Sequence, residues 1–253
     1  MIVAASSQGI GRATATAFAR EGCKVAMCAR NDAALRQAAE EIERTHRVPV
    51  THAAFDVTDP AAVRDFVATV ERRFGGIDVC VTNAGGPPAK EFLATTDEDW
   101  QRAAEQNLLS IVYFAREVIP LMRRKKWGRL ITITSLTVRQ PVTPLVLSNA
   151  VRAGVLGLVR SLANEFGRDG ILVNNVGPGY TATERLKELA QVQARAAGVS
   201  EEDIFRRYSA DTPLGRVARP EEVADTIVWL ASERASFITG QTVLVDGGAY
   251  KGL

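Results

Sequence analysis

Short apolar runs rich in β-branched residues alternate along the chain with longer segments in which apolar residues recur at helical spacing. The runs are apolar on both faces, which is typical of strands covered by helices on both sides of a parallel sheet. We expect strands at residues 2–4, 24–28, 48–55, 77–82, 129–134 and 171–176.

The segments between these runs carry helix signals, and we expect helices at 12–20, 32–44 and 61–74 and a long one ending near residue 126. Pro60 stands in the first turn of the third helix and Gly75-Gly76 ends it, while 95–99 forms a capping sequence for the long one. Strand–helix repetition predicts an α/β fold: a doubly wound parallel β-sheet of about seven strands with helices on both faces.

Nothing in the composition divides the chain, so residues 1–253 are expected to form one domain. Residues 183–212 form a charged, alanine-rich segment interrupted by Gly198-Val199-Ser200. We expect one or two helices here, outside the sheet, that cover a ligand cleft; the alternative is a surface excursion with no such role.

Composition narrows the partners. Apolar residues make up 46% of the chain and charged residues 24%, and the formal charge of +2 is too small to favour nucleic acid or a membrane surface. The basic run 123–126 follows a helical pattern, so it is interpreted as cations at a helix C-terminus rather than as a binding patch. No apolar run is expected to reach membrane-span length, and no signal pattern opens the chain.

Cysteine and histidine usage indicates a reducing compartment and no metal. Cys23, Cys28 and Cys80 are odd in number and lie in or beside apolar strands, as buried reduced thiols do. His46 and His52 have no partner at metal-ligand spacing. We therefore expect a cytoplasmic protein without a metal site.

A glycine-containing turn, 4–11, follows the first strand and opens a helix. Backbone N–H groups at such a helix start can receive a pyrophosphate, and glycines let phosphates approach closely. The candidate residues are Ser7, Gly9, Ile10 and Gly11, and the alternative is a tight turn without a ligand.

The segment from Ser135 to Arg152 resembles the catalytic segment of the short-chain dehydrogenase/reductase family, a family of Rossmann-fold enzymes. Ser135 matches the family's serine and Asn107 its asparagine, but Ser148 and Arg152 occupy the positions of the tyrosine and lysine. The resemblance implies that the serine orients the substrate oxygen, the tyrosine transfers the proton, the lysine binds the nicotinamide ribose and lowers the tyrosine pKa, and the asparagine completes a water relay.

The altered pair has chemical consequences. Ser148 is a much poorer proton donor than tyrosine, and it is shorter by a whole ring. Arg152 can still bind ribose hydroxyls and keep a positive charge, although a planar guanidinium is not equivalent to lysine. Tyr180 is a possible displaced donor, with packing as the alternative role, and Tyr113 lies in the long helix beyond Asn107.

Other pieces match the family in order and spacing, each after a predicted strand, where open α/β sheets bind ligands. The resemblance implies adenine contacts after the third strand, a sheet-stabilising signature under the cofactor after the fourth, and a turn that holds the nicotinamide carboxamide after the sixth. These pieces are Asp56 and Val57; Asn83, Ala84 and Gly85; and Pro178, Gly179, Thr181 and Thr183. The segments 238–241 and 245–248 extend the match towards the C-terminus.

The first turn departs from the family pattern, because Ala4-Ala5 replaces its Thr-Gly pair. If the glycine position needs a positive φ, Ala5 is strained; if it needs only a small side chain, alanine serves. The chain also begins at Met1, whereas members of the family usually carry several more residues before this strand, so either the strand is short or the start lies upstream.

The end of the second strand bears on cofactor choice. Ala29 stands where enzymes that use NAD place a carboxylate, and Arg30 and Asn31 follow. Arginine suits a 2′-phosphate, so NADP is expected rather than NAD, which stays possible. The alternative is that Arg30 is a solvated loop cation.

Two functions remain open at this point. The first is an NADP-dependent oxidoreductase that interconverts a carbonyl and a secondary alcohol, similar to 3-oxoacyl-[acyl-carrier-protein] reductases, acting on a small molecule or an acyl thioester through an atypical proton donor. The second is a dinucleotide-binding pseudoenzyme that serves as a sensor or partner subunit. The resemblance also implies a homodimer or homotetramer.

Overall fold

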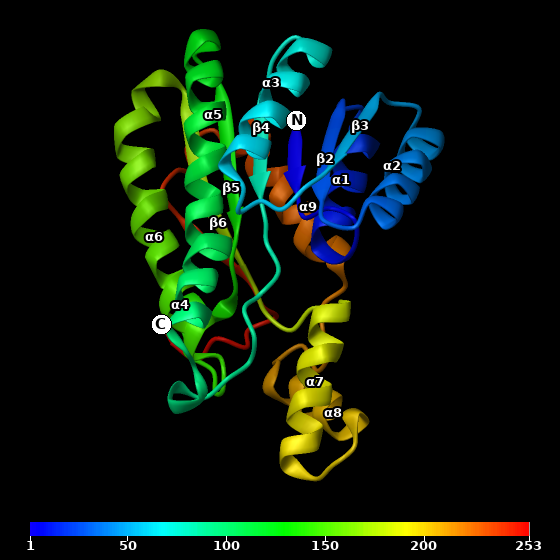
Figure 1. Ribbon diagram of the computed structural model, residues 1–253, viewed down its shortest axis with the longest axis vertical. Coiled ribbons are helices and arrows are strands. Elements are labelled where there is room, and N and C mark those ends of the chain that lie inside the picture. The colour runs from blue at the N-terminus through cyan, green and yellow to red at the C-terminus, as the bar shows by residue number, and fades with distance from the viewer. Residues whose placement is uncertain (253) are drawn as a thin grey trace.

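The computed structural model describes residues 1–252 and contains a parallel seven-stranded sheet in the order β3-β2-β1-β4-β5-β6-β7 (Figure 1). The order reverses between β1 and β4, so the fold is doubly wound, as predicted. The strands are β1 (Ile2–Ala4), β2 (Val25–Ala29), β3 (Val50–Ala54), β4 (Val79–Thr82), β5 (Gly128–Ile133), β6 (Ile171–Pro178) and β7 (Thr242–Val245).

Helices cover both faces of this sheet, and two more lie beyond its carboxyl edge (Figure 1). The helices are α1 (Gly9–Arg20), α2 (Asp32–His46), α3 (Pro60–Phe74), α4 (Asp97–Ala104), α5 (Ser110–Lys125), α6 (Val146–Phe166), α7 (Glu184–Ala197), α8 (Glu201–Asp211) and α9 (Pro220–Ala231). Pro220 opens α9, and Asp59 caps α3 as Pro60 enters its first turn.

Two hydrophobic cores hold these layers together. One lies between the sheet and α1, α2 and α9, and the other lies between the sheet and α3, α5 and α6. Neighbouring residues of β1 serve opposite cores, since Ile2 belongs to the second and Val3 to the first, as the twofold alternation of a strand requires. The central strands are therefore apolar on both faces.

The two edge strands differ from that pattern. β3 is bordered only by β2, and its His52 is exposed, so the expectation that this strand is apolar on both faces was wrong. Its pairing with β2 still places Met27 beside His52. β7 forms the other edge and is held through β6: Asn174 donates to Ile238 O and accepts from Gln241 N.

The long helical region before β5 is not one continuous helix. Thr96 and Asp99 form the expected capping box of α4, but a π-helical turn, Glu105–Leu109, separates α4 from α5. Asn107 lies within this turn. π-turns interrupt α-helices frequently at functional sites. The basic run ends α5 as expected, with Lys126 as its C-cap.

The segment 183–212 forms two helices outside the sheet, α7 and α8, as predicted (Figure 1). Gly198 ends α7 in a left-handed conformation with φ of 66°. The two helices share a small apolar core that includes Leu186, Ile204 and Tyr208. This core gives the segment its own packing at the carboxyl edge of the sheet.

One helix is longer and more apolar than expected. By length and composition alone, the helical residues Val146–Asp169 could cross a membrane, since an 18-residue window within them has a mean hydropathy of 1.2, so the prediction that no run reaches this length was wrong. The helix instead packs its Val155, Val159 and Ala163 against the sheet and carries Arg152 into a cavity. It therefore serves as a layer helix of the α/β fold.

The turn after β1 contains the strained residue that the sequence left open. Ala5 has φ of 47°, in the left-handed region that favours glycine. Gly11 in α1 packs directly behind it, because a Cβ built there would lie 2.2 Å from Ala5 O. The turn keeps its shape with alanine at the first position at the cost of local strain, and the glycine at Gly11 is sterically required.

We predict that Ala5→Gly stabilises the protein by about 1 kcal/mol, because it relieves a left-handed alanine that costs about 1–2 kcal/mol while adding some entropy to the unfolded chain. Urea unfolding measures this change. Ala4→Gly is the matched control: Ala4 is buried in β1, and the same change there should destabilise by about 1 kcal/mol. Equal destabilisation by both variants would contradict the strain at Ala5.

Candidate functional site

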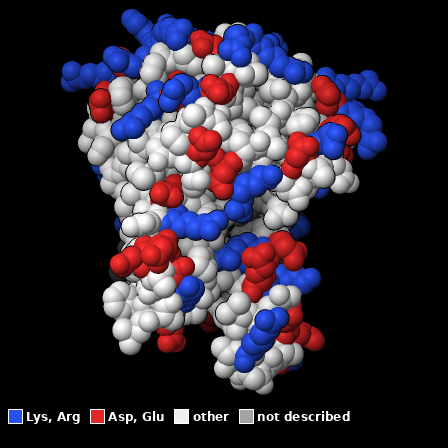
Figure 2. Space-filling view, viewed as in Figure 1, with Lys and Arg blue, Asp and Glu red and all other residues white. Residues whose placement is uncertain are grey.

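A cavity of about 440 Å³ lies at the carboxyl ends of β1 to β6. Figure 2 shows the hollow between the two lower lobes of the molecule, with both cationic and acidic side chains at its border. Fifteen of the residues expected to bind a cofactor line this cavity: Ser7, Gly9, Ile10, Arg30, Asn31, Asp56, Val57, Asn83, Ala84, Gly85, Arg152, Pro178, Gly179, Thr181 and Thr183. The topology therefore brings together segments that are far apart in the chain.

The turn between β1 and α1 is suited to an anion. Gln8 is the N-cap of α1 but makes no side-chain cap, so the first N–H groups of the helix are left for a ligand. Gly9 opens the helix with φ of 56°, and a Cβ there would lie 3.3 Å from Thr183 Cγ2. Gly11, also expected to bind the cofactor, does not line the cavity; its contact is with the Ala5 backbone.

The ends of β2 and β3 form the other extremity of the cavity. Arg30 is exposed at its rim, where its guanidinium is available to a ligand. Asn31 lines the cavity, but its side chain caps α2 by accepting from Ala34 N at 3.1 Å. Asp56 accepts from the backbone N and the hydroxyl of Thr58, which fixes its carboxylate at the edge of the cavity.

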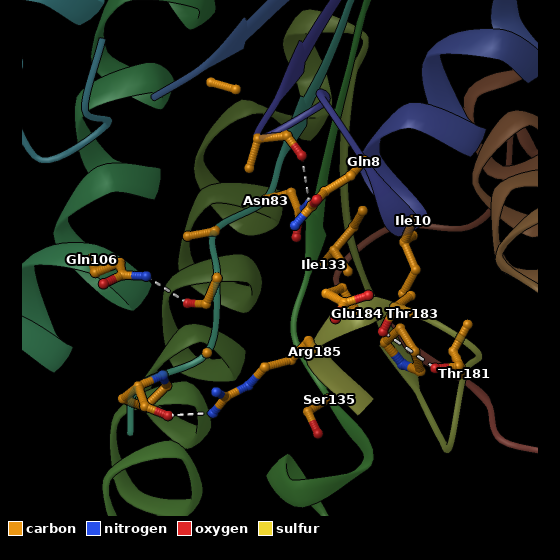
Figure 3. Close-up of a pocket in the computed structure, with 18 of the residues that line it drawn as sticks. Gln8, Ile10, Asn83, Gln106, Ile133, Ser135, Thr181, Thr183, Glu184 and Arg185 are labelled. Carbon is orange, nitrogen blue, oxygen red and sulfur yellow. Dashed lines mark hydrogen bonds between the residues drawn. The ribbon is translucent and has the colours of Figure 1, made fainter. Parts of the chain in front are cut away.

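The segment after β4 is tied to two neighbours. Asn83 Nδ2 donates to Ala5 O at 3.4 Å, which links the first and fourth strand ends (Figure 3). Gln106 Nε2 donates to Gly85 O at 2.7 Å and fixes the loop that follows. Asn83 thus links the ends of two neighbouring strands.

The turn after β6 closes the opposite end. Gly179 N donates to Val245 O, and a Cβ on Gly179 would lie 2.7 Å from Asp246 Cα, so the turn packs tightly against the end of β7. Thr181 is buried, and its hydroxyl donates to Gly179 O. Thr183 caps α7 by accepting from Leu186 N at 3.3 Å. The turn and the first residues of α7 therefore form one wall of the cavity.

Arg152 is the buried cation of the site. Its Nη1 donates to Thr134 O, and its Nη2 donates to Ala84 O at 3.4 Å, while Nε has no hydrogen-bond partner within residues 1–252. Burial, together with the nearby positive charge of Arg185, lowers the pKa of Arg152 to about 10. The guanidinium therefore stays charged at neutral pH, without a carboxylate beside it.

Two serine hydroxyls lie near this cation. Ser135, at the end of β5, accepts from Thr137 N at 3.2 Å, so its own proton is available to a ligand. Ser148 is buried in the first turn of α6, and its Oγ lies 3.3 Å from the hydroxyl of Thr137. Both serines and Arg152 line the cavity, as predicted. Three of the four expected catalytic side chains thus share one wall.

Asn107 is the exception. It does not line the main cavity but borders a separate space of about 10 Å³ together with Thr82 and Arg152. That volume is about the room for one water molecule. The hydroxyl oxygen of Thr82 is also buried there without a hydrogen-bond partner within the described residues. Arg152 therefore borders both the main cavity and the small space that Asn107 lines.

Neither tyrosine considered as a substitute donor reaches the cavity. Tyr180 does not line it; its ring stacks on Tyr208 with centroids 4.4 Å apart, and burial raises the pKa of Tyr180. Tyr113 packs against the second hydrophobic core. Tyr180 is a packing residue, and the hydroxyls that line the site near Arg152 belong to serines.

Two functional candidates were missed in the sequence, Gln106 and Arg185, both of which line the cavity. Gln106 adjoins the matched Asn107, which was a usable signal. Arg185 follows Thr183, but the direction of its side chain depends on how α7 packs. Among residues 1–252, no group of three His, Cys, Asp or Glu could hold a metal ion, and Cys23, Cys28 and Cys80 are free thiols.

Known proteins resemble this chain over its whole length. The putative ketoacyl reductase 1 of the granaticin polyketide synthase of Streptomyces violaceoruber is 35% identical over 98% of this chain and 91% of its own. The 3-oxoacyl-[acyl-carrier-protein] reductase of Escherichia coli is 32% identical over 98% of this chain and 96% of its own.

Solved structures of reductases are also similar to this chain in fold over nearly its whole length. L-sorbose reductase from Gluconobacter frateurii, complexed with NADPH and L-sorbose, has a TM-score of 0.94 and 33% identity and covers 100% of this chain and 96% of its own. Actinorhodin polyketide ketoreductase with NADPH has a TM-score of 0.95 and 31% identity, over 99% and 97%. The family model described as enoyl-(acyl carrier protein) reductase matches residues 4–250. The sheet, the strand-end turns and these likenesses agree: the chain belongs to the short-chain dehydrogenase/reductase family.

Proposed function

We propose that the protein is an NADP-dependent oxidoreductase that interconverts a carbonyl and a secondary alcohol, in the manner of 3-oxoacyl reductases. The observation that carries the proposal is the position of Ser135 and Arg152, which line the same cavity as the dinucleotide-binding turns. The relatives are ketoacyl and 3-oxoacyl reductases, and two of the similar structures contain NADPH. Hydride transfer requires that the cofactor, which donates the hydride, and the carbonyl compound, which accepts it, bind in the same cavity.

The residues present fit a dinucleotide from end to end. The uncapped start of α1 and Gly9 would hold the pyrophosphate, and Arg30 would hold the 2′-phosphate of the adenosine. Asp56 and Val57 would contact the adenine, with Asn31 beside Arg30. At the other end, the turn at Pro178–Gly179 with Thr181 and Thr183 would hold the carboxamide. Bound there, NADPH would supply the hydride.

Ser135 and Arg152 would provide the polar part of the chemistry. The Ser135 hydroxyl already accepts from Thr137 N, so it would donate its proton to the substrate oxygen and orient it. Negative charge develops on that oxygen during reduction, and a fixed cation beside it stabilises such charge. Arg152 is held by two backbone carbonyls and needs no rearrangement to supply that charge.

The proton is the atypical part. Ser148 is paired with Thr137, and an aliphatic hydroxyl does not ionise at neutral pH without an adjacent base. We propose that solvent entering the cavity supplies the proton and that the Ser148 hydroxyl positions it. The small space shared by Thr82, Asn107 and Arg152 has about the room for a second water behind the guanidinium.

A pseudoenzyme is the competing proposal. The pairing of Ser148 with Thr137 favours it, because it leaves no group of suitable pKa beside Ser135. In that case the chain would bind NADP and act as a sensor or partner subunit. The kept hydroxyl of Ser135, which lines the same cavity as the dinucleotide-binding turns, supports the enzyme over this alternative, since a pure dinucleotide binder does not need it.

The surroundings of the site support further proposals. Segment 183–212 would cover the substrate, because Arg185, Leu186 and Leu189 of α7 line the cavity. We also propose a cytoplasmic homodimer or homotetramer that acts on a small carbonyl compound, its alcohol or an acyl thioester. The partly exposed strand β7 and the exposed side of α6 are the surfaces available for assembly.

We predict that Arg30→Asp raises the Kd for NADPH by about 10- to 100-fold and narrows the gap to NADH, because a charge-assisted bond to the 2′-phosphate is lost. The change in nicotinamide fluorescence when NADPH or NADH is titrated with protein measures the Kd of each. Arg44→Asp, an exposed cation on α2 outside the cavity, is the matched control and should change neither. An unchanged Kd for Arg30→Asp would make Arg30 a solvated loop cation.

We predict that the wild type oxidises NADPH with acetoacetyl thioesters and that Ser135→Ala abolishes this activity. Ser148→Tyr combined with Arg152→Lys should raise kcat by about tenfold or more, because a positioned acid contributes about 10²–10⁴-fold to proton transfer. Steady-state kinetics measure both, and thermal melting shows that the variants fold. If the protein binds NADPH tightly but reduces none of a broad panel of carbonyl compounds, the reductase proposal is wrong and the pseudoenzyme proposal is supported.

A further inference from the structure

A second guanidinium crosses the cavity that holds Arg152. Arg185 is the second residue of α7, and its Nη2 donates to Pro87 O on the loop that follows β4 (Figure 3). A Cβ built on Gly86 would lie 3.1 Å from Arg185 Nε, so the side chain rests directly on the backbone of that loop. Arg185 therefore connects the two sides of the cavity at the end where Ser135 lies.

The charge of this end of the cavity is unbalanced. Arg152 takes part in no ion pair within residues 1–252, and Arg185 lies close enough to lower its pKa. The acidic partner of Arg185 is Glu188, at 3.4 Å, with both side chains partly exposed. The interaction free energy of an exposed ion pair at this spacing is small, so Glu188 neutralises the charge of Arg185 only weakly.

Two carboxylates do line the same cavity, but neither faces this end. Asp56 lies at the end of β3 and is bonded to Thr58. Glu184 also lines the adjoining space beside Gly9 and Arg12, whereas Arg185 extends in the other direction, towards Pro87 (Figure 3). The substrate end of the cavity therefore contains two cations and two serine hydroxyls.

The cofactor phosphates do not account for Arg185. The uncapped start of α1 and Arg30 lie at the other part of the cavity, among Gln8, Gly9 and Asn31. A guanidinium presents a planar fork of N–H donors that matches a carboxylate. Nη2 of Arg185 donates to Pro87 O, and Nη1 makes only a long bond of 3.4 Å to the exposed carboxylate of Glu188. An anionic group of the substrate can therefore replace Glu188 as the partner of this guanidinium.

We propose that the substrate is a carbonyl compound that carries a carboxylate, with Arg185 binding the carboxylate while Ser135 binds the carbonyl oxygen. This inference rests on the proposed reductase function, because it assigns the substrate class of the same site. Binding of the carboxylate replaces repulsion between two guanidiniums with attraction and seats the carbonyl carbon between α7 and the end of β5. Arg185 is thereby a specificity-determining residue.

The test compares oxo acids with their methyl esters. NADPH oxidation is measured with 2-oxobutanoate, acetoacetate and levulinate, which vary the spacing of carbonyl and carboxylate, and with the ester of each. We expect at least one acid to exceed its ester by tenfold or more in kcat/KM. Arg185→Gln should remove that preference through a 10- to 100-fold rise in KM, as the loss of a charge-assisted hydrogen bond requires. Arg185→Lys should restore part of it.

The matched control is Arg195→Gln, an exposed cation on the same helix that does not line the cavity, and it should keep the preference. Equal use of acids and esters by the wild type would overturn the inference and leave the reductase function intact. An Arg185-dependent preference for acetoacetyl-coenzyme A over the N-acetylcysteamine thioester, with no use of free acids, would overturn it in favour of a phosphate-bearing substrate.

A binding experiment separates this inference from the reductase proposal. Acetoacetate is titrated calorimetrically into protein saturated with NADP⁺, so that no reduction occurs. Binding that Arg185→Gln abolishes and Arg195→Gln keeps supports the carboxylate site even if no carbonyl compound is turned over. If acetoacetate does not bind while methyl acetoacetate is still reduced, the carboxylate site is contradicted and the reductase proposal stands.

Discussion

The contacts of Arg152 with the backbone at the ends of two strands determine how the site is built. Its guanidinium donates to Thr134 O, just after β5, and to Ala84 O, just after β4, so one side chain ties together the strand ends that surround the cavity. Burying that charge without a carboxylate is costly and is tolerated because carbonyl dipoles accept its hydrogen bonds. Both carbonyls lie at the carboxyl edge of the parallel sheet, and Arg152 reaches them from α6, which packs on one face of that sheet.

This arrangement explains why a changed motif is compatible with an unchanged fold. Lysine would present one small ammonium, whereas the longer, planar side chain of Arg152 reaches two carbonyls and leaves Nε unpaired behind it. Ser148 cannot fill the space of a tyrosine, and its hydroxyl pairs with Thr137 instead. This part of the cavity is thus lined by a buried cation and by the hydroxyls of Ser135 and Ser148.

The sequence predicted what depends on local pattern and strand order. Alternating apolar runs located six strands, and the position of each motif after a strand correctly brought Gly9, Asp56, Asn83 and Gly179 to one cavity. It misjudged features that depend on neighbours. His52 is exposed because β3 is an edge, Gly11 packs on Ala5 rather than on the cavity, and Arg185 crosses the cavity only because α7 packs opposite the loop after β4.

Hydride transfer at this site without a tyrosine can be followed by isotope transfer. The protein is incubated with NADPH deuterated at the reactive C4 position and a carbonyl compound that it consumes, and the alcohol is analysed by mass spectrometry. We expect one deuterium on the carbinol carbon and none with Ser135→Ala. NADPH binding without labelled alcohol from any carbonyl compound tested would contradict this expectation.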